Sequence, residues 1–225
     1  MAHPPGVPTM PDVPDPPDWA ARAEPVDDVR IDVAFIVEPS FYYGPSSQIS
    51  PEQWETLREP LYMPEIPGAA QGFVLSADCT GREDALCRHY RDLLAKAARH
   101  GKDPADGTHF WSRPVVHAPG RLLVEFPWHD RFSDARAFLE SLAPGTPGEV
   151  FSDYEQGWYL DLRLHDGTLY LRNDDPDEGT IFHNLRFAYA PVRAQVDGVL
   201  ARVEALIARL TDALGRDHWT HGQPD

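Results

Sequence analysis

The chain has 225 residues and a formal net charge of −16, because 36 acidic residues face only 20 Lys and Arg. Such a surface repels nucleic acid, so we expect no nucleic-acid partner and favour a basic protein partner. The hydrophobic fraction of 42% is enough for a folded core. No apolar run approaches the roughly 18 residues of a membrane span, so we expect no membrane partner. No secretory signal is visible, and two cysteines are too few for a disulfide scaffold, which predicts a cytoplasmic protein.

Proline dominates the start of the chain, with eight prolines between His3 and Pro25. Because proline lacks a backbone donor and fixes φ, we expect residues 1–27 to form an extended or disordered acidic tail. A role for this tail as a proline-rich docking ligand stays open. One domain over residues 28–216 and a short C-terminal tail over 217–225 should follow. Deletion of residues 1–25 should leave the melting temperature nearly unchanged.

The folded region is predicted to open with a strand over residues 29–37, where Ile31, Val33 and Phe35 alternate onto one face. Ser50-Pro51-Glu52-Gln53 is typical of a helix start with a capping box. The elements expected next are a short strand over 72–76, a helix over 82–100 that ends at Gly101, strands over 110–116 and 121–126, and a short helix from Ser133.

A hairpin over residues 157–172 is the clearest element. Asp166-Gly167 stands between two alternating runs, and both residues tolerate the positive φ of a type I′ turn. A two-residue turn pairs Leu164 with Leu169 and Leu162 with Leu171, which gathers all four leucines on one face. The opposite face receives Asp161, Arg163, Tyr170 and Arg172.

A strand over 180–189 and a helix over 191–214 complete the chain, and Gly215 stops the helix. Hairpins replace regular βαβ alternation in this order of elements. We therefore expect an α+β fold, with an antiparallel sheet of about six or seven strands covered on one face by helices and with a long C-terminal helix.

An acidic loop is predicted between Asn173 and Gly179. Its first residues follow the start of a calcium-loop pattern, but Glu178 stands where the pattern needs glycine, and the distal glutamate is missing. We therefore expect no metal there. A solvated turn and a contact surface for a cationic partner both stay open.

The remaining residues carry no recognised catalytic pattern. Cys79, Cys87 and His89 do not have zinc-ligand spacing, and there is no nucleophile elbow, zinc-protease motif or phosphate-binding glycine loop. We expect no cofactor and favour binding over catalysis. One alternative is a small hydrolase or transferase whose site is assembled from dispersed His, Asp and Glu residues. A second is a non-catalytic subunit of a larger complex of unknown oligomeric state.

Aromatic residues accompany the acidic region, and exposed tyrosines beside carboxylates are typical of protein interfaces. The hairpin that carries Trp158-Tyr159, the acidic loop over 173–178 and the lack of a catalytic signature give the chain a general character that resembles bacterial immunity proteins, the cytoplasmic antitoxins of secreted or injected toxins. The resemblance implies a stoichiometric inhibitor that covers a toxin's active site with an acidic surface. The residues expected to contact the partner are Asp174, Asp175, Asp177, Glu178, Trp158, Tyr159, Asp161, Tyr170, Tyr42 and Tyr43.

Overall fold

The protein is seen in a computed structural model that describes residues 16–45, 50–104, 107–126, 131–155 and 157–220. The first fifteen residues of the expected N-terminal tail and the last five of the C-terminal tail lie outside these ranges. In chain order the elements are η1 (Asp18–Arg22), β1 (Glu24–Pro25), β2 (Arg30–Ile36), β3 (Ser40–Tyr42), α1 (Pro51–Thr56), β4 (Arg58–Pro60), η2 (Ala69–Gln71), β5 (Phe73–Leu75), α2 (Ser76–Cys79), α3 (Glu83–His100), β6 (Ser112–Ala118), β7 (Arg121–Glu125), α4 (Phe132–Ser141), β8 (Gly148–Glu155), β9 (Trp158–His165), β10 (Thr168–Asp175), β11 (Thr180–Ala188) and α5 (Tyr189–Leu214).

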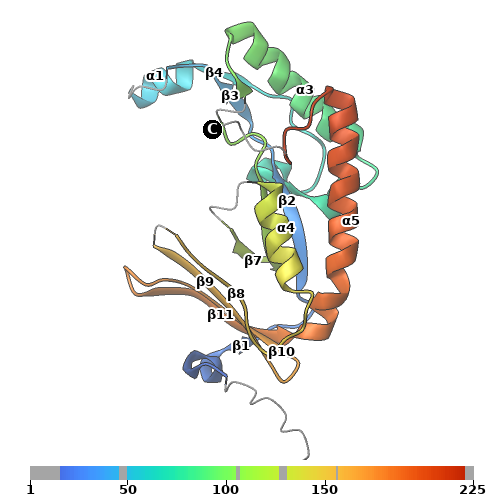
Figure 1. The fold of residues 1–225 in the computed structure, drawn as a ribbon. Coiled ribbons are helices and arrows are strands. Elements are labelled where there is room, and N and C mark those ends of the chain that lie inside the picture. Colours follow the sequence, from blue (N-terminus) through green and yellow to red (C-terminus); the bar gives the residue numbers. More distant parts are fainter. Residues whose placement is uncertain (1–15, 46–49, 105–106, 127–130, 156, 221–225) are drawn as a thin grey trace, which may run out of the picture. The chain divides into compact units, whose positions relative to one another are not determined.

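The predicted α+β class is confirmed, with antiparallel pairing dominant and a long C-terminal helix, α5 (Figure 1). The strands do not form one sheet of six or seven. They are divided into a five-stranded sheet, a four-stranded sheet and a two-stranded sheet. Two compact units contain them: one combines the ranges Met1–Asp27 and Pro144–Ala190, and the other combines Asp28–Ala143 and Pro191–Asp225.

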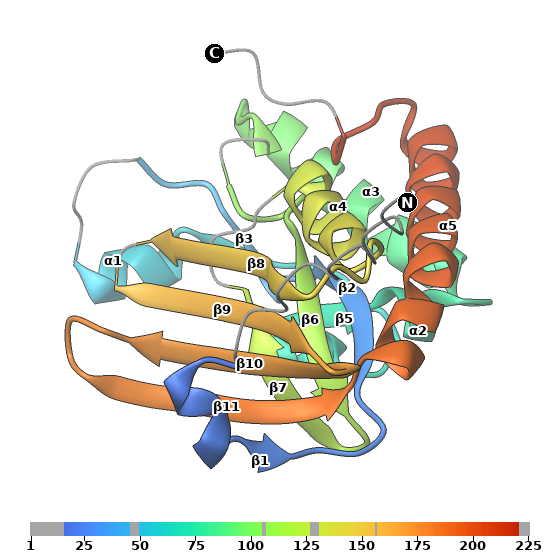
Figure 2. The ribbon, with the colours of Figure 1, turned by 60° about the horizontal axis from the view of Figure 1, so that its bottom comes forward.

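The first unit holds the five-stranded sheet, in the order β1-β11-β10-β9-β8 (Figure 2). Its central pair is the predicted hairpin, and the register is the one expected, with Leu164 opposite Leu169 and Leu162 opposite Leu171. Asp166 and Gly167 have φ values of 45° and 71°, as a type I′ turn requires. The four leucines are buried. Alternation and turn chemistry therefore determine this register together.

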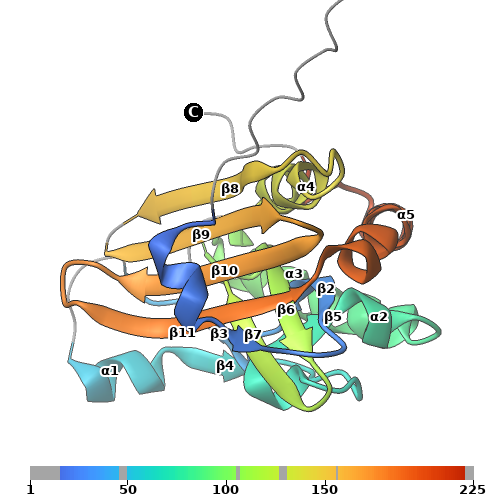
Figure 3. The ribbon, with the colours of Figure 1, turned by 90° about the horizontal axis from the view of Figure 1, so that it is seen from below.

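The sheet also contains strands that the sequence does not predict. β8 joins the hairpin as an edge strand beside β9, and β1 pairs with β11 in parallel. Figure 3 shows η1 lying across this sheet, where the Trp19 ring meets the Tyr170 ring edge to face at 6.4 Å. The last ten residues of the expected N-terminal tail therefore include ordered secondary structure.

This arrangement reverses our expectation for the deletion of residues 1–25. Glu24 and Pro25 of β1 pair with Leu185 and Arg186 of β11, the Asn184 amide donates to the Trp19 carbonyl at 3.1 Å, and Ala20 is buried. Deletion should expose the β11 edge and lower the melting temperature by several degrees, at ~2–4 °C per kcal/mol for a chain of this size. Thermal unfolding followed by circular dichroism measures the change. A melting temperature equal to that of the full chain would contradict this prediction.

The second unit is built on the four-stranded sheet β5-β2-β6-β7. β2 is one of its two interior strands, and every residue of β2 after Arg30 is buried, so both faces of this strand are covered. Helix α4 lies against β6. The predicted capping box is present at α1, where Ser50 and Gln53 bond reciprocally. Gly101 ends α3 with a φ of 62°, as the sequence predicts.

The beginning of the expected C-terminal tail is packed into this unit. Trp219 is only 2% exposed, and its ring meets the rings of Phe35 and Tyr90 at 6.1 and 5.1 Å. The chain therefore contributes to the core beyond the end of α5. Among the residues that the structure describes, no helix is long and apolar enough to cross a membrane.

Candidate partner-binding surface

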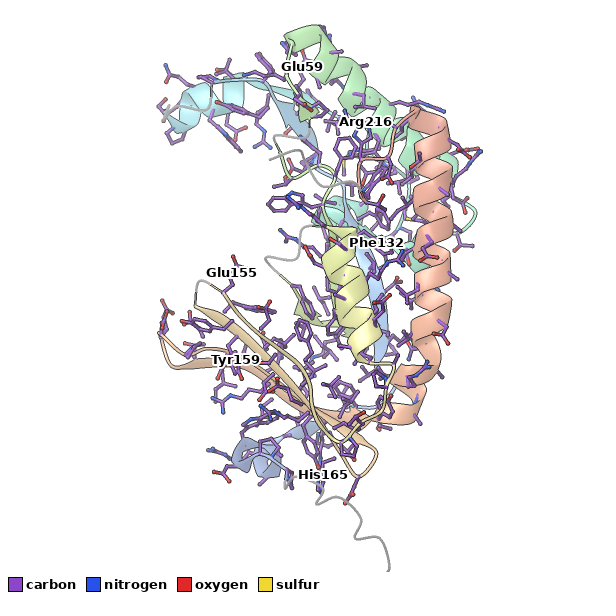
Figure 4. All side chains as sticks on the ribbon, in the orientation of Figure 1. Glu59, Phe132, Glu155, Tyr159, His165 and Arg216 are labelled. Carbon is purple, nitrogen blue, oxygen red and sulfur yellow. The ribbon has the colours of Figure 1, made fainter. Side chains whose placement is uncertain are left out.

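One end of the five-stranded sheet brings together most of the residues that the sequence analysis selected. At this end Tyr154, Tyr159, Asp174 and Ile181 stand opposite one another on successive strands, from β8 to β11. Cross-strand neighbours of an antiparallel sheet point to the same face. The four side chains therefore form one row across the sheet, and Figure 4 labels Tyr159 and the nearby Glu155.

This end is unusually apolar for an exposed surface. Within the described residues, three of the five exposed large apolar side chains lie here: Tyr154, Ile181 and Phe182, which are 55%, 53% and 49% exposed. Phe182 is the extra residue of the bulge between β10 and β11, because Asn173 pairs with His183 and Asp174 already pairs with Ile181. A cluster of exposed apolar side chains indicates an interaction surface more strongly than any one of them does.

Exposed carboxylates lie beside these apolar side chains. Asp177 and Glu178 are exposed in the β10–β11 turn, and their backbone N–H groups both donate to Asp175 Oδ1 at 3.0 Å. The β8–β9 turn comes close to the same carboxylate, since a Cβ on Gly157 would lie 3.4 Å from Asp175 Oδ1. The two turns thus form one acidic edge. We call the set Tyr154, Tyr159, Asp175, Asp177, Glu178, Ile181 and Phe182 the acidic end of the sheet.

Tyr154 connects the apolar row to the acidic turn. Its hydroxyl donates to the Asp177 carboxylate at 3.3 and 3.4 Å to the two oxygens, and its ring lies 6.4 Å from that of Tyr159. The negative charge of Asp177 raises the pKa of Tyr154, because it disfavours the phenolate. Tyr154 therefore keeps its hydroxyl proton and presents an exposed ring beside two carboxylates.

Two of the selected acids do not contribute free charge. Asp161 and Asp174 are 4% and 5% exposed, and each pairs with an arginine two residues away on its own strand. Arg163 Nε donates to Asp161 at 2.8 Å, and Arg172 Nε donates to Asp174 at 2.7 Å. Burial alone would lower the pKa of Arg163, but its bonds to Asp161 and the charge of Glu149 raise it. These pairs are local ion pairs of the sheet.

The selected aromatic residues are divided between the faces of the sheet. Trp158 is only 9% exposed and lies on the leucine face, two residues before Leu160. Tyr170 stands on the opposite face beneath Trp19 of η1. Neither side chain is among the exposed apolar residues at the acidic end of the sheet.

Tyr42 and Tyr43 belong to the other unit, at the end of β3. The Tyr42 ring stacks on Trp54 at 5.9 Å, and the Tyr43 ring stacks on His100 at 4.0 Å. Their hydroxyls donate to the carbonyls of Pro45 and Thr56. Both tyrosines are half-buried and engaged in local contacts, as expected for residues that hold a loop in place.

The cysteines and histidines do not form a metal centre within the part of the chain that the structure describes, where no cluster of three His, Cys, Asp or Glu side chains could hold an ion. Cys79 and Cys87 are both buried free thiols. Burial raises the pKa of the Cys79 thiol to about 12, so it is protonated at neutral pH and a poor nucleophile.

Comparison of the chain with protein-family models, with curated proteins and with solved structures found no match.

Sequence reasoning missed Tyr154, Ile181 and Phe182, which are the exposed apolar part of the acidic end. Tyr154 lies on β8, whose residues do not alternate cleanly between apolar and polar, and Phe182 occupies a bulge. A signal was nonetheless present, because Ile181-Phe182 is separated from the acidic loop by Thr180 alone and an apolar pair beside a charged turn is typical of an interface.

Proposed function

We propose that this protein binds a basic protein partner through the acidic end of the sheet, as a stoichiometric inhibitor of the immunity-protein type acting on a toxin in the bacterial cytoplasm. The observation that supports it is the set of exposed apolar side chains, Tyr154, Ile181 and Phe182, at the same end of the sheet as Asp175, Asp177 and Glu178. Binding energy in protein interfaces comes mainly from a few aromatic anchors, whereas surrounding charges steer the encounter.

The two kinds of residue should have separable effects. Tyr154 and Phe182 supply the area that a partner can bury, so their loss should speed dissociation. Asp177 and Glu178 are exposed, so their loss should mainly slow association and weaken its dependence on salt. A protein with a net charge of −16 attracts any basic protein to some extent, which makes a matched charge control necessary.

The test begins with affinity capture from native lysate on the wild-type protein and on the Tyr154→Ala, Phe182→Ala variant. A partner of the acidic end is retained by the wild type and lost from the variant. Its dissociation constant, measured by surface plasmon resonance, should rise by at least about thirtyfold in the variant, which corresponds to ~2 kcal/mol. Equal retention of every captured protein by both samples would contradict the proposal.

The charge arm compares two variants with the same change in net charge. Asp177→Asn with Glu178→Gln alters the acidic end, whereas Asp166→Asn with Glu140→Gln alters exposed carboxylates elsewhere. The first pair should slow association and reduce its salt dependence, and the second should change both much less. If both pairs slow association equally, the partner responds to net charge and the acidic end is not its site.

A further inference from the structure

A separate pocket of 290 Å³ lies in the second unit, among β3, α1, β4 and the segment that follows α3. It contributes nothing to the acidic end of the sheet, and the proposed function does not use it. Its volume is just below the ~300–1,000 Å³ typical of small-molecule sites. Its charged and titratable lining residues are Glu38, Arg58, Lys102, Asp103 and His109, and Tyr42 and Trp54 are aromatic walls.

His109 is a buried polar group in this pocket whose hydrogen bonding is incomplete. The residue is 6% exposed, and its ring lies 5.8 Å from that of Phe41. Nδ1 is buried and has no hydrogen-bond partner within the described residues, and Glu38 Oε2 stands 4.0 Å away. Burial lowers the pKa of His109, the charge of Glu38 opposes this, and Arg58 adds to it. The ring is therefore neutral at neutral pH, and an unpaired buried nitrogen of this kind is costly.

Glu38 completes an arrangement suited to an ammonium group. Its Oε1 accepts a hydrogen bond from the Thr108 hydroxyl, and its Oε2 faces His109 Nδ1. In the neutral tautomer of His109 that carries its proton on Nε2, Nδ1 and Glu38 Oε2 are two acceptors 4.0 Å apart, which one group with several N–H hydrogens can reach at ~2.8–3.0 Å each. A primary ammonium supplies three such hydrogens and also the positive charge that the carboxylate favours.

The same pocket holds two cations with unused donors. Arg58 Nε donates to Ser40 Oγ at 2.7 Å, and its guanidinium lies 3.8 Å from the centre of the Trp54 ring. Lys102 Nζ donates to the Gly44 carbonyl at 2.7 Å. Across the described residues neither forms an ion pair with a carboxylate, although the chain carries a net charge of −16. These contacts hold the side chains of Arg58 and Lys102 in place and leave further N–H groups of each free to bind an anionic ligand.

We propose that this pocket binds a small zwitterion, a free α-amino acid, with its ammonium at Glu38 and His109 and its carboxylate at Arg58 and Lys102. A ligand with several negative charges is disfavoured by Glu38 and Asp103, which both line the pocket. A simple cation would leave the remaining N–H groups of Arg58 and Lys102 without an acceptor. Only a molecule that carries both charges satisfies the two halves of the pocket.

The test uses the full chain and the standard L-amino acids, each at millimolar concentration, in saturation-transfer NMR followed by calorimetry for those that bind. At least one should bind saturably. The matching amine without the carboxylate, and the matching acid without the amine, should each bind more weakly by about tenfold or more, because each lacks one charged hydrogen-bonding group. Binding of the amine alone with equal affinity, or no saturable binding by any amino acid, would overturn the proposal.

Substitutions of residues that line the pocket test whether the amino acid binds there. Glu38→Gln and Arg58→Gln should each weaken it by about tenfold or more. Glu59→Gln is the matched control, because Glu59 neighbours Arg58 on β4 but pairs with Arg99 and His100 and does not line the pocket. Circular dichroism checks that each variant is folded. If Glu38→Gln does not fold, Arg58→Gln alone tests the pocket. Unchanged affinity in the folded variants would place the ligand elsewhere and refute the assignment.

Discussion

Replacing Arg202 by methionine is expected to lower the free energy of unfolding by about 3–5 kcal/mol, because it leaves a buried carboxylate without its cation. That carboxylate belongs to Asp32, which is 2% exposed at the centre of β2. Arg202 on α5 donates to Asp32 Oδ1 at 3.2 Å and, through Nε, to Ser76 Oγ at 2.9 Å. The Ser76 hydroxyl and the Ala77 N–H also donate to the Asp32 carboxylate.

Urea unfolding followed by circular dichroism measures this loss, and Arg209→Met on the same helix provides the control. Arg209 pairs with Asp84 at 2.9 Å, but both side chains are exposed, at 57% and 88%. An exposed pair contributes only about 0–1 kcal/mol. If both variants lose a similar free energy of unfolding, the buried Asp32 carboxylate does not need Arg202 as its counter-charge.

A double variant separates charge compensation from packing. If the loss in Arg202→Met comes from an uncompensated carboxylate, then adding Asp32→Asn should recover much of it, because the amide carries no charge and still accepts hydrogen bonds from Ser76 and Ala77. A double variant that loses the sum of the two single effects would instead show that the Arg202 side chain matters through its own contacts.

Local chemistry accounts for what the sequence predicts correctly. The hairpin register follows from alternating leucines and from Asp166-Gly167, and α3 ends where Gly101 permits a positive φ. The capping box at Ser50 predicts the start of α1. In each case the determining residues lie within a few positions of the element that they define, so a single sequence contains the whole signal.

Features that depend on distant residues were not predictable in this way. The bond between Asp32 and Arg202 joins residues 170 positions apart, and a lone Asp in an apolar strand does not say which cation will meet it. The pairing of β1 with β11 is equally remote, and its two residues, Glu24 and Pro25, have no strand character of their own. The division of the strands into separate sheets follows from such long-range pairings.

The acidic end of the sheet contains features that the sequence predicts correctly and features that it does not. Asp177 and Glu178 are exposed, as an acidic turn predicts. Charge counting overestimated the contribution of Asp161 and Asp174, because an arginine two residues along a strand lies on the same face and can neutralise each. The apolar row became visible only through the register of β8 and the bulge of β11, since those pairings place Tyr154 and Ile181 on either side of the hairpin.

Replacing Leu162 by alanine is expected to lower the free energy of unfolding by about 2–5 kcal/mol, because it removes a buried side chain from the centre of the five-stranded sheet. Leu162 is 1% exposed and stands between Phe151 of β8 and Leu171 of β10 in the cross-strand register. A smaller side chain leaves a cavity beside these neighbours, and the surrounding strands can relax to fill it only in part.

Ile181→Ala is the matched variant, since it shortens an aliphatic side chain of the same sheet at a position that is 53% exposed. Its effect on stability should stay within about 0.5 kcal/mol, as for most surface substitutions, whereas the proposed function requires that it weaken partner binding. Urea unfolding of both variants gives the comparison. If Leu162→Ala costs no more than Ile181→Ala, the leucine face contributes little to the folded state. If Leu162→Ala is the costly variant and Ile181→Ala loses only binding, then the leucine face stabilises the sheet and its acidic end is free to bind.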